Sequence, residues 1–230
     1  EQIHRDKPVS PPGTQSVYSD LGFIILGEAV EILTGNTLDR YCQEKIFRPL
    51  GLRSTGFVDL SQLRTRRLQP VEDMIAPTEN CPWRKKILCG EVHDDNAYAM
   101  GSVAGHAGLF SSARDVHAFL VQMNKCLQGK DSFVPQAVVQ EFLTKNESSS
   151  HGNFALGWDT PSAEKSASGS LFSARSVGHL GFTGCSIWWD LERNCHVVLL
   201  TNRVHPSRKN EKIKEFRPAI HDEIMKVFFP

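Results

Sequence analysis

Apolar residues recur at helical spacing in four segments of the first 150 residues. The helices predicted from this pattern cover about residues 20–34, 37–47, 113–127 and 135–144. We expect Asp20 to cap the first helix and Gly35 to end it, while Ser112 followed by Asp115 gives a capping signal for the third. Residues 51–100 contain three prolines and no regular period, so we expect long surface loops there.

The pattern changes after about residue 152, where short runs rich in β-branched and aromatic residues predict strands. These runs are residues 154–158, 176–182, 186–190 and 196–201, followed by an amphipathic helix over 211–229. Short turns join the last three runs, as in an antiparallel meander. The sequence therefore predicts an α+β fold, with a mostly helical lobe with long loops at 1–152 and antiparallel strands with a C-terminal helix at 153–230, both within one domain.

The predicted strand at 196–201 contains the run Val197-Val198-Leu199-Leu200, which does not alternate polar with apolar. A strand that is apolar on both faces belongs inside a sheet, and on an edge it would promote aggregation. Chain order offers it one neighbour, the preceding hairpin strand. We therefore expect a segment before residue 1, or another chain, to cover its other side.

Charge and cysteine content narrow the range of partners. The 26 basic and 26 acidic residues cancel, so nothing in the net charge points to nucleic acid or an anionic membrane. A small-molecule or peptide substrate fits this balance better. The six cysteines lack the spacing of a disulfide framework or of a zinc site, so we expect free thiols and no metal. No signal peptide or membrane-spanning run is visible.

Two stretches near the N-terminus carry a family resemblance. Residues 11–20 read Pro-Pro-Gly-Thr-Gln-Ser-Val-Tyr-Ser-Asp, and residues 47–57 read Phe-Arg-Pro-Leu-Gly-Leu-Arg-Ser-Thr-Gly-Phe. Together they resemble the second catalytic motif, and the sequence after it, of the penicillin-recognising serine hydrolases, which include class C β-lactamases, DD-peptidases and related esterases. The resemblance implies that Tyr18 is the proton shuttle. A phenol with a pKa of about 10 becomes a useful base when a nearby cation favours the phenolate.

Asp20 stands where this family more often has Asn. A carboxylate can accept a hydrogen bond from a lysine but cannot donate one to a substrate carbonyl. Asp20 is therefore a candidate catalytic residue, a simple helix cap, or both.

Residues 178–190 resemble the third family motif, on the strand that borders the active site. His179 takes the cation position, Leu180 the position of the usual Thr, and Gly181 the Gly that lets substrate approach the backbone. The resemblance implies that the Phe182 N–H is one of two oxyanion donors. Leu180 lacks the hydroxyl that helps to hold a substrate carboxylate, which weakens the case for penicillin-like or D-alanyl substrates. His179 could help to tune Tyr18 or hydrogen-bond substrate, and the alternative is an ordinary solvent-facing histidine.

A third region resembles one branch of the family. It comprises Gly-Glu-Val-His-Asp-Asp-Asn-Ala at 90–97 and a glycine-rich turn with His106 at 101–111. His93, Asp94, Asn96 and His106 are candidate substrate-cleft residues. An equally good interpretation is a hydrogen-bonded network that holds a long loop in place.

The nucleophile motif of the family, Ser-x-x-Lys, does not precede Tyr18 in this sequence. The match at Ser162-Ala163-Glu164-Lys165 comes after Tyr18 in a stretch without helical pattern, and we interpret it as chance. We therefore expect residues 1–230 to be the C-terminal part of a longer protein and to be inactive alone.

The resemblance covers about residues 9–228 and implies an antiparallel sheet flanked by helices, beside a helical lobe. It implies acyl transfer through an acyl-enzyme, with no cofactor, on a β-lactam, a D-alanyl peptide or an ester. The alternative is a non-catalytic relative that binds peptidoglycan or peptide. The compartment, cytoplasmic or periplasmic, stays open.

Overall fold

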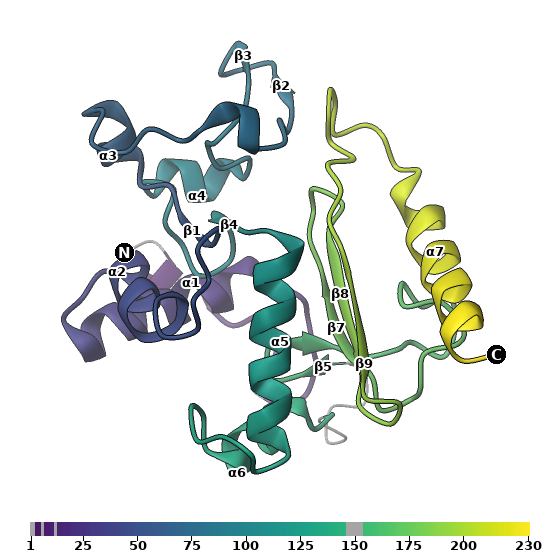
Figure 1. Ribbon diagram of the computed structural model, residues 1–230. Helices are drawn as coiled ribbons and strands as arrows, with labels where there is room; N and C mark the ends of the chain where they lie inside the picture. The colour runs from purple at the N-terminus through teal and green to yellow at the C-terminus, as the bar shows by residue number, and fades with distance from the viewer. Residues whose placement is uncertain (1–2, 6, 12, 146–153) are drawn as a thin grey trace.

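A computed structural model describes residues 3–5, 7–11, 13–145 and 154–230 (Figure 1). It confirms the expected α+β class, with most helices before residue 145 and the main sheet after it. The longer helices are α1 (Asp20–Thr34), α5 (Ala113–Leu127), α6 (Gln136–Leu143) and α7 (Ile213–Phe228). The shorter ones are η1 (Ile3–Arg5), α2 (Leu38–Cys42), η2 (Gln43–Phe47), α3 (Leu60–Arg64), η3 (Glu72–Met74) and α4 (Asp95–Ala99).

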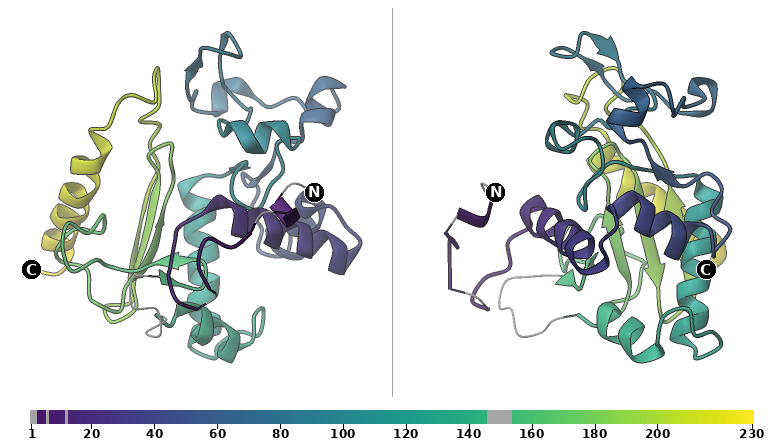
Figure 2. Two further views of the ribbon diagram at one scale, coloured as in Figure 1. Left: turned by 180° about the vertical axis from the view of Figure 1, so that it is seen from behind. Right: turned by 90° about the vertical axis from the view of Figure 1, so that its left-hand side faces the viewer.

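The main sheet is antiparallel and has five strands in the order β5-β6-β7-β8-β9. Their bounds are β5 (Phe154–Ala155), β6 (Trp158–Asp159), β7 (Val177–Leu180), β8 (Ser186–Asp190) and β9 (Cys195–Leu199). Helix α5 covers one face of this sheet and α7 the other, as Figures 1 and 2 show. Two small two-stranded sheets pair β1 (Gly56–Phe57) with β4 (Leu109–Phe110), and β2 (Asn80–Cys81) with β3 (Lys86–Ile87).

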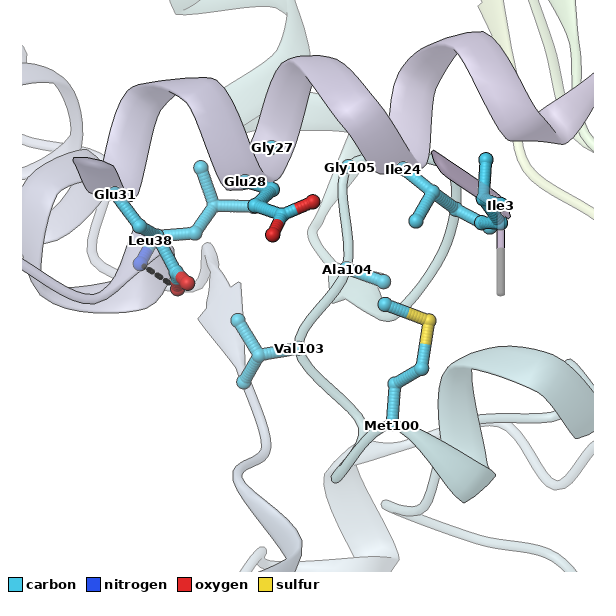
Figure 3. Close-up of a pocket in the computed structure, with 10 residues that line it drawn as sticks. All are labelled: Ile3, Ile24, Gly27, Glu28, Glu31, Leu38, Met100, Val103, Ala104 and Gly105. Carbon is cyan, nitrogen blue, oxygen red and sulfur yellow. Dashed lines mark hydrogen bonds between the residues drawn. The ribbon is translucent and has the colours of Figure 1, made fainter. Parts of the chain in front are cut away.

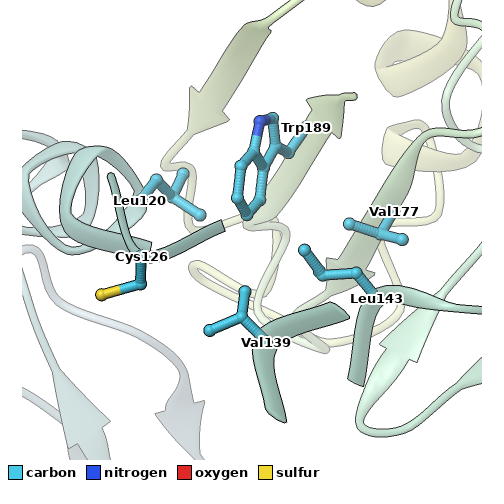
Figure 4. Packing of buried hydrophobic residues seen from close by; sticks show 6 residues of the cluster. All are labelled: Leu120, Cys126, Val139, Leu143, Val177 and Trp189. Atoms are coloured by element: carbon cyan, nitrogen blue, oxygen red, sulfur yellow. The ribbon is translucent and has the colours of Figure 1, made fainter. Parts of the chain in front are cut away.

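Consecutive tryptophans on β8 build the two halves of the core. Successive side chains of a strand point to opposite faces, so Trp188 and Trp189 separate to the two sides of the sheet. Both are essentially fully buried. Trp189 packs under α5 and α6 with Leu120, Cys126, Val139, Leu143 and Val177 (Figure 4). Trp188 packs with Phe172 and Met225 beneath α7. Gly178 faces the Trp188 ring across the strand pair, where a Cβ would overlap the indole.

Helix α1 begins and ends at local signals, one of which differs from expectation. Ser19, and not Asp20, is the N-cap, since its side chain accepts a hydrogen bond from the Leu21 N–H. Asp20 is the first helical residue, where its negative charge favours the helix N-terminus. Gly35 adopts the left-handed conformation that ends the helix, as predicted.

The surface of α1 is unusually apolar. Leu21, Ile25, Leu26, Ile32 and Leu33 are all exposed. Among the described residues no single helix is long and apolar enough to cross a membrane, although α1 and the segment Leu38–Phe47, bent by 75°, meet the length and composition test as a pair.

Other elements follow the prediction or correct it in detail. The single strand expected at 154–158 is a tight hairpin, β5 and β6, because Gly157 takes a positive φ between them. Within 51–100 the loops carry short helices and one hairpin. In the described part of the chain β9 pairs with β8 alone and forms an edge of the sheet. Its cover by a further segment stays a prediction, as does the division at residue 152.

Candidate active site

Tyr18 and His179 come together although 160 residues separate them in the sequence. Tyr18 lies just before the Ser19 cap of α1, and His179 lies on β7. Their ring centroids are 6.1 Å apart, with an angle of 42° between the planes. The ring centroid of Phe154, on β5, lies 6.3 Å from that of Tyr18. The second and third motifs therefore meet at one place, between the start of α1 and strands β5 and β7.

The charges around Tyr18 favour the neutral phenol. Partial burial raises the pKa of Tyr18, and the carboxylates of Asp20 and Asp159 raise it further. Burial also raises the pKa of Asp159, an effect that His179 opposes. Among the described residues, the charged groups that shift the pKa of Tyr18 are therefore carboxylates, and none is a cation that would favour the phenolate.

His179 is oriented by the backbone. Its Nδ1 lies 3.0 Å from the Leu180 carbonyl oxygen. A carbonyl can only accept, so Nδ1 carries the hydrogen and donates it. The remaining nitrogen, Nε2, is then the atom that can accept a proton or a hydrogen bond.

A tight turn follows β7 and holds the backbone amide predicted to bind the oxyanion. Gly181 N–H donates to the Cys185 carbonyl at 2.8 Å, and Gly184 N–H donates to the Gly181 carbonyl at 3.0 Å. The Phe182 N–H has no hydrogen-bond acceptor among the described residues. An N–H that is left unpaired by the protein is available to bind an oxyanion.

Leu180 does not line this site, which corrects our interpretation of it. Its side chain packs against the cluster of Phe172, Trp188 and Met225 beneath α7. The reason is the strand alternation: since His179 faces Tyr18, the next side chain on β7 points to the opposite face. The Leu180 side chain is therefore part of the packing between the sheet and α7.

A network of charges ties residues 79–95 to the chain near residue 208. Arg208 donates to the Glu79 carboxylate at 2.6–3.0 Å, and His93 Nε2 lies 3.1 Å from Glu79. Arg208 holds the pKa of Glu79 at about 2, well below its ordinary value. Burial lowers the pKa of His93. The His93 ring stacks on the Phe182 ring, with 5.7 Å between the centroids and 22° between the planes. This network therefore contacts the turn that follows β7.

Two of the other predicted cleft residues, Asp94 and His106, hydrogen-bond within the loop region. Asp94 caps α4 by accepting from the Ala97 N–H, and its carboxylate lies 3.0 Å from His106 Nε2. Asn96 is exposed on α4. Of the four, His93 contacts the turn at Phe182, while Asp94 and His106 fit the alternative interpretation of a network that holds a loop.

A hollow of about 430 Å³ lies elsewhere, between α1 and residues 100–105 (Figure 3). Its walls are mostly apolar, and two acids, Glu28 and Glu31, project from α1. Glu31 accepts a hydrogen bond from the Leu38 N–H at 2.8 Å. Neither Tyr18 nor His179 lines this hollow, so we do not assign the chemistry to it.

The chance interpretation of Ser162-Ala163-Glu164-Lys165 agrees with the structure. This stretch forms bends and not a helix, and Lys165 has a positive φ. A helix start that would aim the serine is therefore absent at these described residues. No group of three or more His, Cys, Asp or Glu side chains in the described part of the chain is placed to hold a metal ion.

Sequence reasoning missed Asp159 and Arg217. Asp159 follows a tryptophan on a two-residue strand, and no motif points to it. Arg217 lies inside an amphipathic helix, where an arginine is normally read as part of a solvated face. Only the packing of β6 and α7 reveals that both side chains approach the third motif.

Comparison with known proteins supports the resemblance. A protein-family model described as Beta-lactamase matches residues 1–219. An Escherichia coli (strain K12) protein whose name proposes a D-alanyl-D-alanine carboxypeptidase is 34% identical over 216 residues, covering 89% of this chain and 49% of that protein. An N-acetylmuramyl-L-alanine amidase of Bacillus subtilis (strain 168) is 37% identical over 205 residues, covering 84% of this chain and 45% of the amidase.

The chain thus spans about half the length of the curated relatives it matches. A solved beta-lactamase structure from Mycobacterium bovis superimposes with a TM-score of 0.67 at 20% identity, covering 99% of this chain and 70% of that one. At that identity the likeness concerns the fold.

Proposed function

Since this chain belongs to the beta-lactamase family, we propose that residues 1–230 form part of the active site of a serine hydrolase that transfers acyl groups. The observation that carries the proposal is that the ring centroids of Tyr18 and His179 lie 6.1 Å apart. His179 is on the strand that leads to Phe182, whose N–H has no acceptor among the described residues. Besides a nucleophile, acyl transfer needs a proton shuttle and an oxyanion donor. Tyr18 and the Phe182 N–H are the candidates for these two parts, and His179 is a polar residue next to Tyr18.

In the proposed reaction a serine Oγ attacks the substrate carbonyl carbon, and its proton passes to Tyr18. The Phe182 N–H binds the oxygen that becomes negative. Tyr18 returns the proton to the leaving amine or alcohol as the C–N or C–O bond breaks, which leaves an acyl-serine. Water then attacks the ester, again with Tyr18 as base, and releases the acid and the free serine.

The nucleophile of this proposal lies outside residues 1–230, because no Ser-x-x-Lys precedes Tyr18 in them. The lysine of that motif would also supply the cation that lowers the pKa of Tyr18 against its acidic neighbours. We propose that the segment carrying the motif covers the exposed apolar residues of α1 or the free edge of β9. Residues 1–230 alone are then inactive.

The first substrate class to test is an alanine-containing peptide. The names of two relatives refer to amide bonds of alanine, a D-alanyl-D-alanine bond in one and an N-acetylmuramyl-L-alanine bond in the other. With Leu180 turned into the core, its lack of a hydroxyl no longer argues against such a peptide. Simple esters and penicillins are the comparison substrates.

The test is covalent labelling of the full-length protein with a fluorophosphonate or a fluorescent penicillin, followed by mapping of the tagged residue. A labelled serine outside residues 1–230, lost when that serine is replaced by alanine, supports the proposal. Labelling of Ser162 would overturn it. A protein that binds alanyl peptides yet is never labelled would instead be the non-catalytic binder.

A further inference from the structure

Arg217 of α7 is buried beneath the turn that follows β7, with 7% of its surface exposed. Its guanidinium donates three hydrogen bonds, all to backbone carbonyls of that turn. Nη2 donates to Gly181 O at 2.6 Å and to Cys185 O at 2.8 Å, and Nε donates to Gly184 O at 3.1 Å. One side chain therefore fixes the turn from inside the α7 layer.

Arg217 forms no ion pair with any carboxylate among the described residues. Burial lowers the pKa of Arg217, as does the charge of Arg203, while the Cys185 thiol acts in the opposite sense. A buried cation without a counter-ion costs stability, because no opposite charge compensates its desolvation. No paired carboxylate neutralises the positive charge of Arg217, so this charge acts on the peptide groups of the turn.

The Gly181 carbonyl belongs to the same peptide group as the Phe182 N–H. A trans peptide is planar, and its C=O and N–H point in opposite directions. The carbonyl points to Arg217 and the β8 side, so the N–H points to the other edge of β7. On that edge β6 pairs with β7 at Gly178 and not beyond, which leaves the Phe182 N–H open.

We propose that Arg217 is a positioning residue of the oxyanion hole. Through its hydrogen bond to the Gly181 carbonyl, it orients and polarises the Gly181–Phe182 peptide. The inference rests on the proposed acyl transfer. A charged donor on the carbonyl withdraws electron density from the peptide and makes its N–H a stronger donor, because hydrogen bonds in a chain reinforce one another. The donor is also held in place before the negative charge forms, so no reorganisation is needed at that moment.

Arg203 offers a matched control at the same turn. Its Nε donates to the Phe182 carbonyl at 2.8 Å, and its guanidinium lies 4.4 Å from the centre of the Phe182 ring. That carbonyl belongs to the next peptide, whose N–H is that of Thr183. Arg203→Gln therefore loosens the same turn without removing the hydrogen bond from Arg217 to the Gly181 carbonyl.

The kinetic test compares Arg217→Gln, Arg217→Lys and Arg203→Gln in the full-length protein. The substrate is p-nitrophenyl acetate, which has no carboxylate for an arginine to bind. We expect Arg217→Gln to lower kcat about 10- to 100-fold with little change in KM, since loss of a whole oxyanion donor costs about 100- to 1,000-fold. Arg217→Lys, which keeps a charge but lacks the planar fork, should recover part of that loss.

A nuclear magnetic resonance test does not depend on turnover. Labelling glycine with ¹³C at the carbonyl and phenylalanine with ¹⁵N selects Gly-Phe peptides, and residues 1–230 hold three, at 22–23, 56–57 and 181–182. Phe182→Leu assigns the third signal by removing it. In Arg217→Gln the chemical shifts of the 181–182 carbonyl and amide should change. The other two signals should keep their chemical shifts, which would show that the fold is intact.

The outcomes separate the two hypotheses. Absence of acylation in the wild-type protein contradicts the proposed function. An active wild type in which Arg217→Gln and Arg203→Gln lower kcat equally contradicts the role of Arg217 and leaves the proposed function standing. An unchanged 181–182 signal in Arg217→Gln also contradicts the role of Arg217, whether or not the protein turns over substrate.

Discussion

Gly105 lies so close to the Phe23 carbonyl of α1 that a Cβ at position 105 would overlap the carbonyl oxygen. Gly27 on the same helix faces the Gly105 backbone, where its own added Cβ would lie 3.1 Å from the Gly105 nitrogen. The glycine-rich turn therefore packs backbone against backbone on the helix that follows Tyr18. Close packing against α1 therefore explains why position 105 carries glycine.

This contact gives a paired stability prediction. Gly105→Ala should lower the free energy of unfolding by about 2–3 kcal/mol, because backbone atoms must move to admit a methyl group. Gly22, in the first turn of α1, has no atom within 4 Å of an added Cβ. Gly22→Ala should raise stability by up to about 1 kcal/mol through helix propensity. Urea unfolding of both variants measures the contrast, and equal effects would contradict the packing argument.

The phenol of Tyr18 should matter for chemistry and not for folding. Tyr18 is 60% exposed, so Tyr18→Phe should leave the unfolding midpoint nearly unchanged. Loss of the proton shuttle should lower kcat about 100- to 10,000-fold in the full-length protein. The control is Tyr41→Phe on α2, which should keep full activity. A Tyr18→Phe variant with wild-type kcat would remove Tyr18 from the mechanism.

Replacing Asp20 should change the ionisation of Tyr18. After burial, the Asp20 carboxylate is the largest cause of the raised pKa of Tyr18, and Asp159 is the next. A negative neighbour disfavours the phenolate, so its removal must lower this pKa. Asp20→Asn should therefore shift the tyrosinate absorbance titration to lower pH, and Asp159→Asn should shift it less. Subtracting the titration of Tyr18→Phe isolates this group from the other tyrosines.

Glu79 should make folding stability depend on pH in the acid range. Its pKa is about 2 in the folded protein and 4.5 ordinarily, so its contribution is complete above about pH 4.5 and disappears as the pH falls towards 2. Glu79→Gln should lack this part of the pH dependence.

At neutral pH, Glu79→Gln should lose roughly 1–3 kcal/mol, less than for a fully buried pair because Arg208 is 38% exposed. Glu211→Gln, which breaks an exposed pair with Lys214, is the control and should change stability too little to measure. A Glu79→Gln variant with the wild-type acid slope would show that the network does not stabilise the fold.

The sequence by itself determined the elements whose signals are local. Periodicity and capping residues placed α1 and α5, and Gly35 marked the end of α1 at the position where a left-handed residue occurs. The run 197–200 indicated a strand that is apolar on both faces, and the motifs at Tyr18 and His179 indicated the family. Such signals are readable because each depends on residues within one or two turns of the chain.

Only the tertiary structure decided which side chains meet. The packing of β6 brings Asp159 towards Tyr18, the alternation along β7 turns Leu180 into the core, and α7 carries Arg217 beneath the Gly181 carbonyl. A carboxylate, a leucine and an arginine have many ordinary roles, so their identities alone do not assign them. Their roles follow from strand register and from the face on which a helix packs, and both are set by contacts between residues far apart in the chain.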